Sequence, residues 1–208
     1  MRKSLLLLAL CFGGAGIALM LSGTLAQVPP APTAKGLRPA ASFANIEDQR
    51  ARSIALFEEA GKVIQSPRCV NCHPVGDRPR QTDGRRLHIP LVVRGADGFG
   101  APGMRCKTCH HDNNFDQVGI PGNDHWHLAP VSMTWEGRTL GQICEQLKDP
   151  ARNDNRVAAD MAKHVTTDTL VKWAWSPGGD RAPVPGTNEE FGELLRAWAE
   201  TGAECPSP

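Results

Sequence analysis

The chain has 208 residues, of which 40% are hydrophobic and 22% are charged, so it is long enough for one domain or two small ones with a sizeable core. This composition excludes collagen, a coiled coil and a multi-span membrane protein. The 23 basic residues are balanced by 22 acidic ones, and only 5% of residues are aromatic, so nothing in the composition indicates nucleic-acid binding.

The first 26 residues have the pattern of a secretory signal peptide. Arg2 and Lys3 precede an apolar stretch over residues 4–22, and Thr24-Leu25-Ala26 supplies small residues at the −3 and −1 positions of a cut after Ala26. An apolar run of this length is near the lower limit for crossing a bilayer, so an uncleaved anchor is the alternative. The folded part is expected to be periplasmic or otherwise exported, with no stable membrane insertion if the signal is cleaved.

Residues 27–42 are rich in proline and alanine and predict a flexible linker, which leaves residues 43–206 as the folded domain. Ser42 is expected to cap a helix that runs to Ser66-Pro67 with its apolar residues broadly on one face. The repeated glycines and prolines of residues 74–103 predict a long ordered loop, and loops of that length are usually functional.

Further helices are expected over residues 139–148, 157–164 and 167–175. A capping box, formed by Thr187 and Glu190, predicts the start of a last helix that stops at Gly202. No stretch alternates convincingly as a strand would. The fold class is therefore expected to be mostly α, with short helices and long Gly/Pro-rich loops.

One motif, Cys-x-x-Cys-His, occurs twice in the folded region. It reads Cys69-Val-Asn-Cys72-His73 at the first position and Cys106-Lys-Thr-Cys109-His110 at the second. Two cysteines at this spacing can add to the two vinyl groups of a haem, and the histidine that follows is placed to ligate the iron. The sequence therefore predicts two covalently bound haem c groups, with the helices and loops packed around them.

Three other interpretations of the cysteine pairs are less consistent with the sequence. A structural zinc site is disfavoured because the 33 residues between Cys72 and Cys106 exceed the roughly 15 to 20 of such sites, and both histidines would be unexplained. A thioredoxin-like dithiol needs a βαβ context that the sequence lacks. A disulfide across two intervening residues is strained.

Six cysteines remain once Cys11 leaves with the signal, and two of them lie outside the two motifs. In an oxidising compartment Cys144 and Cys205 are expected to form a disulfide, and two buried thiols are the alternative.

Each haem iron has a second axial position, where methionine raises the reduction potential and histidine lowers it. Four residues are the main candidates for these positions, and His111 is a weaker one that could serve only the neighbouring haem. The four are His88, His164, Met133 and His127. If one iron lacks a second ligand, its open position would allow peroxide or small-molecule chemistry.

Beyond the doubled motif, which resembles those of c-type cytochromes, five segments are similar to a group of small bacterial dihaem proteins often labelled as isoquinoline 1-oxidoreductase subunits. They are Arg94-Gly-Ala-Asp-Gly98, Gly103-Met-Arg-Cys-Lys-Thr-Cys-His110, His125-Trp-His-Leu-Ala-Pro130, Ile143-Cys-Glu-Gln-Leu-Lys-Asp-Pro-Ala-Arg-Asn153 and Trp173-Ala-Trp-Ser-Pro-Gly178. The resemblance covers residues 43–206. It implies electron transfer alongside a partner, not ring hydroxylation by this chain.

The expected function is that of an exported dihaem cytochrome c. It would shuttle single electrons between a periplasmic oxidoreductase and a respiratory acceptor, with redox proteins as partners and no catalytic activity of its own. The alternatives are a small haem enzyme or ligand-binding sensor with one open iron, and a zinc-bound structural module.

Overall fold

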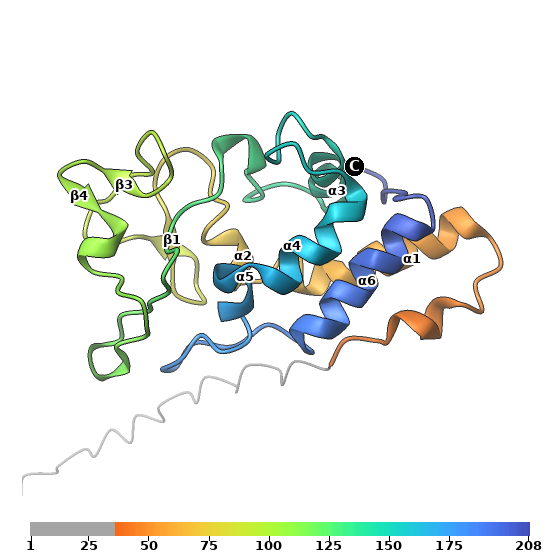
Figure 1. Ribbon diagram of the computed structural model, residues 1–208, viewed down its shortest axis with the longest axis horizontal. Helices are drawn as coiled ribbons and strands as arrows, with labels where there is room; N and C mark the ends of the chain where they lie inside the picture. The colour runs from red at the N-terminus through yellow and green to blue at the C-terminus, as the bar shows by residue number, and fades with distance from the viewer. Residues whose placement is uncertain (1–35) are drawn as a thin grey trace, which may run out of the picture. The chain divides into compact units, whose positions relative to one another are not determined.

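The computed structural model describes residues 36–208, which are mostly helical with four very short strands (Figure 1). The predicted mostly-α class is confirmed at this level. The predicted signal peptide and the first part of the predicted linker lie outside the described residues. None of the helices in the described range combines the length and the apolar character needed to cross a membrane.

The last part of the predicted linker, residues 36–42, is not a linker but packs onto the domain. Leu37 is buried in the main hydrophobic core, and a 3-10 turn, η1 (Ala40–Phe43), buries Phe43 beside it. Arg38 donates from its backbone N–H and from Nε to the carboxylate of Glu59, at 2.9 and 3.2 Å. The prediction was wrong here because one isolated leucine among prolines gives no periodic signal.

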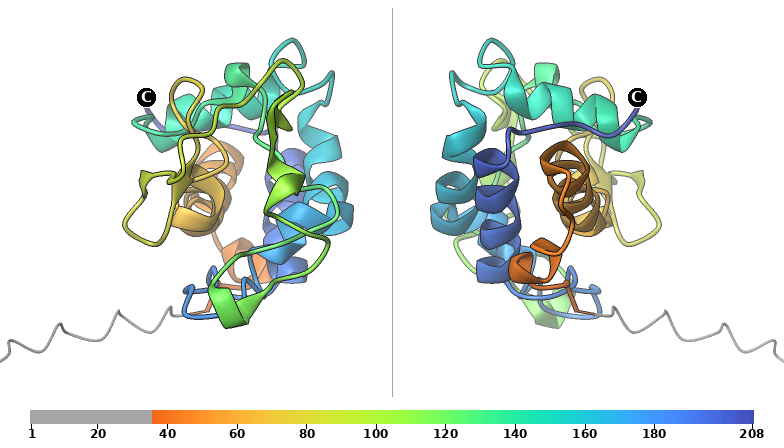
Figure 2. Two further views of the ribbon diagram at one scale, coloured as in Figure 1. Left: turned by 90° about the vertical axis from the view of Figure 1, so that its left-hand side faces the viewer. Right: turned by 90° about the vertical axis from the view of Figure 1, so that its right-hand side faces the viewer.

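The core is built by three helices that lie side by side (Figures 1 and 2). They are α1 (Gln49–Ile64), α4 (Met161–Thr167) and α6 (Asn188–Glu200). Phe57 of α1 meets Trp198 of α6 with ring centroids 4.8 Å apart, and both side chains are fully buried. Burial of such large apolar side chains is the main force that holds these helices together.

The ends of the long helices follow from local side-chain chemistry. The predicted capping box is confirmed: the Thr187 hydroxyl accepts from the Glu190 N–H at 3.1 Å, and the Glu190 carboxylate accepts from the Thr187 N–H at 2.8 Å. The first long helix begins later than predicted, because Asp48 caps it by accepting from the Ala51 N–H at 2.7 Å. Ser42 instead donates to the Pro39 carbonyl within the preceding turn.

The remaining helical elements are short and surround the two Cys-x-x-Cys-His motifs. The α-helical ones are α2 (Pro67–Val70), α3 (Leu140–Lys148) and α5 (Thr169–Trp173). The 3-10 turns are η2 (Cys106–Thr108), η3 (Asp116–Val118), η4 (Val131–Met133) and η5 (Ala158–Asp160). A disulfide joins Cys144 of α3 to Cys205 near the end of the chain, as predicted.

The predicted long loop over residues 74–103, together with the two residues after it, contains short antiparallel pairs that the sequence did not indicate. β1 (Arg80–Gln81) pairs with β2 (Arg86–Leu87), and β3 (Gly100–Ala101) pairs with β4 (Met104–Arg105). Strands of two residues are too short to show an alternating pattern. In Figure 1 the labelled strands β1, β3 and β4 lie away from α1 and α6.

Candidate functional site

The two Cys-x-x-Cys-His motifs share one local fold. The first follows α1 through α2, and the second begins with η2. In each motif the histidine N–H donates to the carbonyl of the first cysteine, from His73 to Cys69 at 3.2 Å and from His110 to Cys106 at 2.9 Å. A single tight turn therefore brings both thiols and the imidazole of each motif to the same cavity.

The two motif histidines are held in the same way. The Nδ1 atom of His73 lies 2.7 Å from the Met133 carbonyl, and that of His110 lies 2.7 Å from the Pro121 carbonyl. A carbonyl only accepts hydrogen bonds, so each Nδ1 carries the proton and each Nε2 presents a free lone pair. This is the tautomer that binds a metal through Nε2.

A tryptophan stacks on each of these imidazoles and fixes its plane. The His73 and Trp135 rings are 3.6 Å apart with an angle of 10° between their planes, and the His110 and Trp126 rings are 4.5 Å apart at 11°. A stacked ring cannot rotate freely. Both Nε2 atoms are therefore oriented before any ligand binds.

Burial keeps the groups of the first motif uncharged. Loss of hydration lowers the pKa of His73 to about 4 and raises the pKa of Cys69 to about 11 and that of Cys72 to about 12. At the second motif, burial lowers the pKa of His110 to about 4 and raises the pKa of Cys106. Both imidazoles are therefore in the neutral form that ligates metals at pH 7.

Each motif borders its own cavity. The first cavity lies between the first motif and the side chains of α3, α4, α5 and α6, and its wall is largely apolar. The second lies between the second motif, the β1–β2 hairpin and the chain around residues 119–128. The cavity volume in which the centre of a water molecule can lie is about 200 Å³ for the first cavity and about 670 Å³ for the second.

The two cavities adjoin each other. Four residues line both of them, and these are Arg68, Cys72, His127 and Trp173. Flat groups bound in the two cavities would thus be separated by single side chains.

His88, predicted as a ligand from the sequence, lies in the second cavity and faces His110. The two ring centroids are 5.9 Å apart, with 62° between the planes. Imidazoles that bind one iron from opposite sides have centroids about 6 Å apart, because a metal–nitrogen bond is about 2 Å long and the ring centre lies about 1 Å beyond the nitrogen. The spacing of this pair matches that arrangement.

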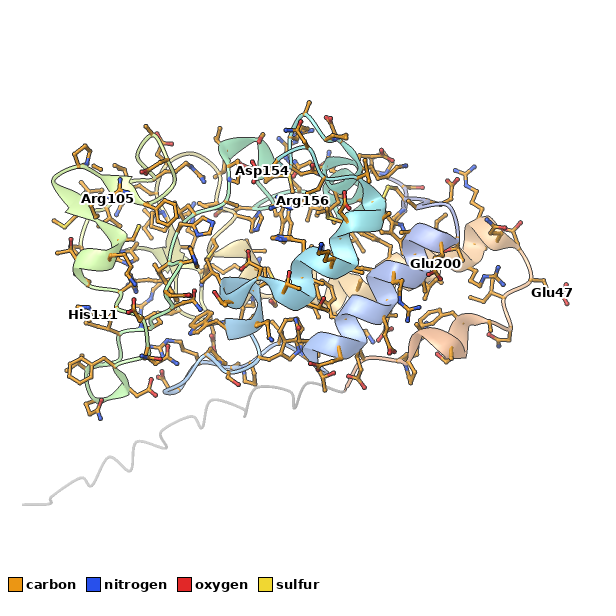
Figure 3. All side chains as sticks on the ribbon, in the orientation of Figure 1. Glu47, Arg105, His111, Asp154, Arg156 and Glu200 are labelled. Atoms are coloured by element: carbon orange, nitrogen blue, oxygen red, sulfur yellow. A yellow bond between two sulfur atoms is a disulfide. The ribbon has the colours of Figure 1, made fainter. Side chains whose placement is uncertain are left out.

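Three other predicted ligands border the first cavity. His164 reaches it from α4, and burial is the main cause that lowers its pKa. His127 lines both cavities, and its ring stacks on Phe99 with centroids 4.8 Å apart. Met133 is buried, and its carbonyl receives the His73 hydrogen bond described above. His111 is exposed on the loop around the second motif and lines neither cavity (Figure 3).

An ion pair closes part of the first cavity. Asp154 and Arg156 line it from the loop between α3 and η5, where Figure 3 labels them, and Arg156 Nη1 lies 3.2 Å from Asp154 Oδ2. The sequence pattern of this loop did not indicate that role.

Several buried polar atoms at the cavities have no hydrogen-bond partner among residues 36–208. They are Trp135 Nε1 at the first cavity, and Arg68 Nε, Asn71 Oδ1 and Arg80 Nε at the second. Three of these four are donors, and a buried unpaired donor is costly unless a bound group accepts from it. A bound group that carries carboxylates would accept hydrogen bonds from these three donors.

Arg68 is the site residue that sequence reasoning missed most clearly. Its side chain is only 4% exposed, forms an ion pair with Asp83 and lines both cavities. The one available signal was its position directly before Cys69.

Among residues 36–208, no three histidine, cysteine, aspartate or glutamate side chains converge on a common metal position. Comparisons of the chain with family models, with curated proteins and with solved structures give no match.

Proposed function

We propose that this chain is an exported dihaem c-type cytochrome that transfers single electrons between redox proteins. The observation that carries the proposal is the paired geometry: each motif histidine is neutral, fixed by a carbonyl and a tryptophan, and directed at a cavity that both motif cysteines border. Cys69 and Cys72 would hold one haem and Cys106 and Cys109 the other, with His73 and His110 as iron ligands. When bound, haem supplies reversible one-electron chemistry.

The chain's own residues would position the groups and exclude water. The apolar wall of the first cavity would keep water from a haem held there, and water access affects the reduction potential of a haem. The unpaired N–H groups of Arg68 and Trp135 would donate hydrogen bonds to the carboxylates of the bound groups. The shared wall allows electron exchange within one chain, so electrons could enter at one site and leave at the other.

His88 is the proposed second ligand at the second motif, on the basis of its distance from His110. Replacement of His88 by alanine is expected to convert one of the two ferric haems from low spin to high spin, because an imidazole is lost from one axial position. Absorption and electron paramagnetic resonance spectra of the oxidised protein measure this change. His125→Ala is the matched control, since His125 is exposed and lines neither cavity. Unchanged spin at both haems in His88→Ala would remove His88 from the proposed ligand set.

His164 is the proposed second ligand at the first motif. Met133 is a weaker candidate for this ligand, because its carbonyl accepts the hydrogen bond from His73 Nδ1. That atom is on the edge of the ring away from Nε2, where the iron would bind. His127 is held by its stacking on Phe99, and its Nδ1 contacts the His125 carbonyl.

His164→Ala is therefore expected to make the haem at the first motif high spin and leave the other unchanged. Lys163→Ala, an exposed neighbour on the same helix, is the control. If His127→Ala gives the change and His164→Ala does not, the ligand assignment moves to His127.

The alternative function, that of a small haem enzyme or sensor, would use an open iron position in the first cavity. Within the described residues, the His73 ring stacks on Trp135, but no imidazole pairs with it as His88 pairs with His110. A high-spin ferric haem in the unaltered protein, together with peroxide turnover, would favour the haem enzyme or sensor. Two low-spin haems without turnover would support the electron carrier.

A further inference from the structure

Arg68 carries a buried positive charge at the wall that the two cavities share. Its side chain is almost fully buried and lines both cavities. The other three residues that line both cavities are Cys72, His127 and Trp173, and none of them carries a permanent charge. Within residues 36–208, Arg68 is therefore the one permanently charged residue that borders both cavities.

Contacts on two sides keep the Arg68 guanidinium at this wall. It forms an ion pair with Asp83, whose other carboxylate oxygen accepts from the Ala182 N–H at 3.3 Å. The guanidinium carbon also lies 6.0 Å from the centre of the Trp173 ring, in a cation–π contact. That ring is itself held, because Trp173 Nε1 donates to Asn114 Oδ1 at 2.9 Å. The charge therefore has a defined place between the two cavities.

The positive charge of Arg68 is compensated only in part. Asp83 accepts from Nη2, whereas the buried Nε has no hydrogen-bond partner among residues 36–208. The Asp83 side chain is 47% exposed, so water screens its charge more than it screens that of the buried guanidinium. A buried charge acts more strongly on its surroundings than an exposed one, because the effective dielectric constant is lower. Both cavities therefore receive a net positive field from this one residue.

We infer that Arg68 sets the reduction potentials of both haems together, through its charge at the shared wall. The inference rests on the proposed function, because it assumes a haem in each cavity. Reduction adds one electron to an iron, and no bond is formed or broken. A nearby positive charge favours the ferrous form, which carries one positive charge less than the ferric form, and so raises the potential. One charge at the shared wall therefore raises both potentials.

Potentiometric titration of the full chain with both haems bound tests the inference. Arg68→Gln removes the charge and keeps a long polar side chain. It is expected to lower both potentials, each by about a tenfold change in the ratio of ferrous to ferric haem at a fixed applied potential. For a one-electron couple this is a shift of about 59 mV. Arg68→Lys keeps the charge, and both ratios should stay within about twofold of those of the unaltered protein.

Two other arginines are matched controls, because each pairs with one aspartate and lines only one cavity. Arg156 lines the first cavity, with Nη1 3.2 Å from Asp154 Oδ2, and Arg181 lines the second, with Nη1 3.5 Å from Asp116 Oδ1. Arg156→Gln is expected to lower one potential and Arg181→Gln the other, which also assigns each potential to its motif. Arg68→Gln should lower both.

A change to the partner carboxylate tests the same charge with the opposite sign. Asp83→Asn leaves Arg68 in place without its counter-charge, so both potentials should rise. Asp116→Asn is its control and should raise only the potential that Arg181→Gln lowers. This pair gives the answer even if Arg68→Gln fails to fold or to bind both haems. If Asp83→Asn leaves the potential at the first motif unchanged, the inference is wrong.

The remaining outcomes separate the inference from the proposed function. A haem count on the unaltered protein that finds no haem would overturn the proposed function itself. With two haems present, a shift of only one potential in Arg68→Gln, or of neither, would overturn the inference alone and leave Arg68 a purely structural role. Equal shifts of both potentials in Arg156→Gln or Arg181→Gln would also overturn it, because the place of Arg68 at the shared wall would then have no special effect.

Discussion

Replacement of Cys106 and Cys109 by alanine is expected to leave a protein that carries one haem per chain instead of two. Each haem would be attached through the thiols of its own motif, and each motif histidine lines only its own cavity. The haem at Cys69 and Cys72 should remain, because its cavity is built by helices that the change does not touch. A haemochrome assay on purified, matured protein measures the ratio of haem to polypeptide.

The matched control also removes a pair of cysteines. A chain with Cys144→Ala and Cys205→Ala should keep both haems, since these sulfurs are joined to each other and lie outside both motifs. The converse change, at Cys69 and Cys72, should leave only the haem of the second motif. Retention of two haems after either motif is removed would contradict the assignment of one motif to one haem.

Loss of the disulfide is expected to lower the free energy of unfolding by about 4 kcal/mol. The bond spans a sequence separation of 61 residues, and it connects α3 to the chain end that follows α6. Without this cross-link the unfolded chain gains conformational entropy, which stabilises the unfolded state. Domains of this size are stable by about 5 to 15 kcal/mol, so the loss is a large share of the total.

Guanidinium denaturation, followed by far-ultraviolet circular dichroism, measures this difference. Cys205→Ala alone is the sharper variant, because it breaks the bond and leaves the fully buried Cys144 side chain in the core. The variant with both Cys144→Ala and Cys205→Ala should lose somewhat more stability, because removal of the buried Cys144 sulfur also leaves a small cavity. A free energy of unfolding within about 1 kcal/mol of the original would show that the cross-link contributes little.

Features that depend on neighbouring residues were predictable. The capping box at Thr187 and Glu190 lies within four positions of the chain, and the structure forms both of its hydrogen bonds. The helix over residues 140–148 likewise follows Thr139, which caps it together with Gln142. The doubled motif is equally local, since five consecutive residues supply both thiols and the imidazole.

Features that depend on distant contacts were not predictable. The carbonyl that fixes His73 belongs to Met133, 60 positions away, and a backbone carbonyl carries no residue-specific signal. The sequence predicts Met133 as an iron ligand through its thioether. In the structure, its backbone carbonyl accepts a hydrogen bond from His73. Burial of Leu37 and of Arg68 arises from packing between segments, which periodicity within one segment cannot show.

The haem content of the exported protein tests the central claim most directly. A haemochrome assay, combined with the intact mass of the mature chain, should give two haems per polypeptide that remain attached after denaturation. A colourless protein whose mass equals that of its amino acids alone would contradict the account.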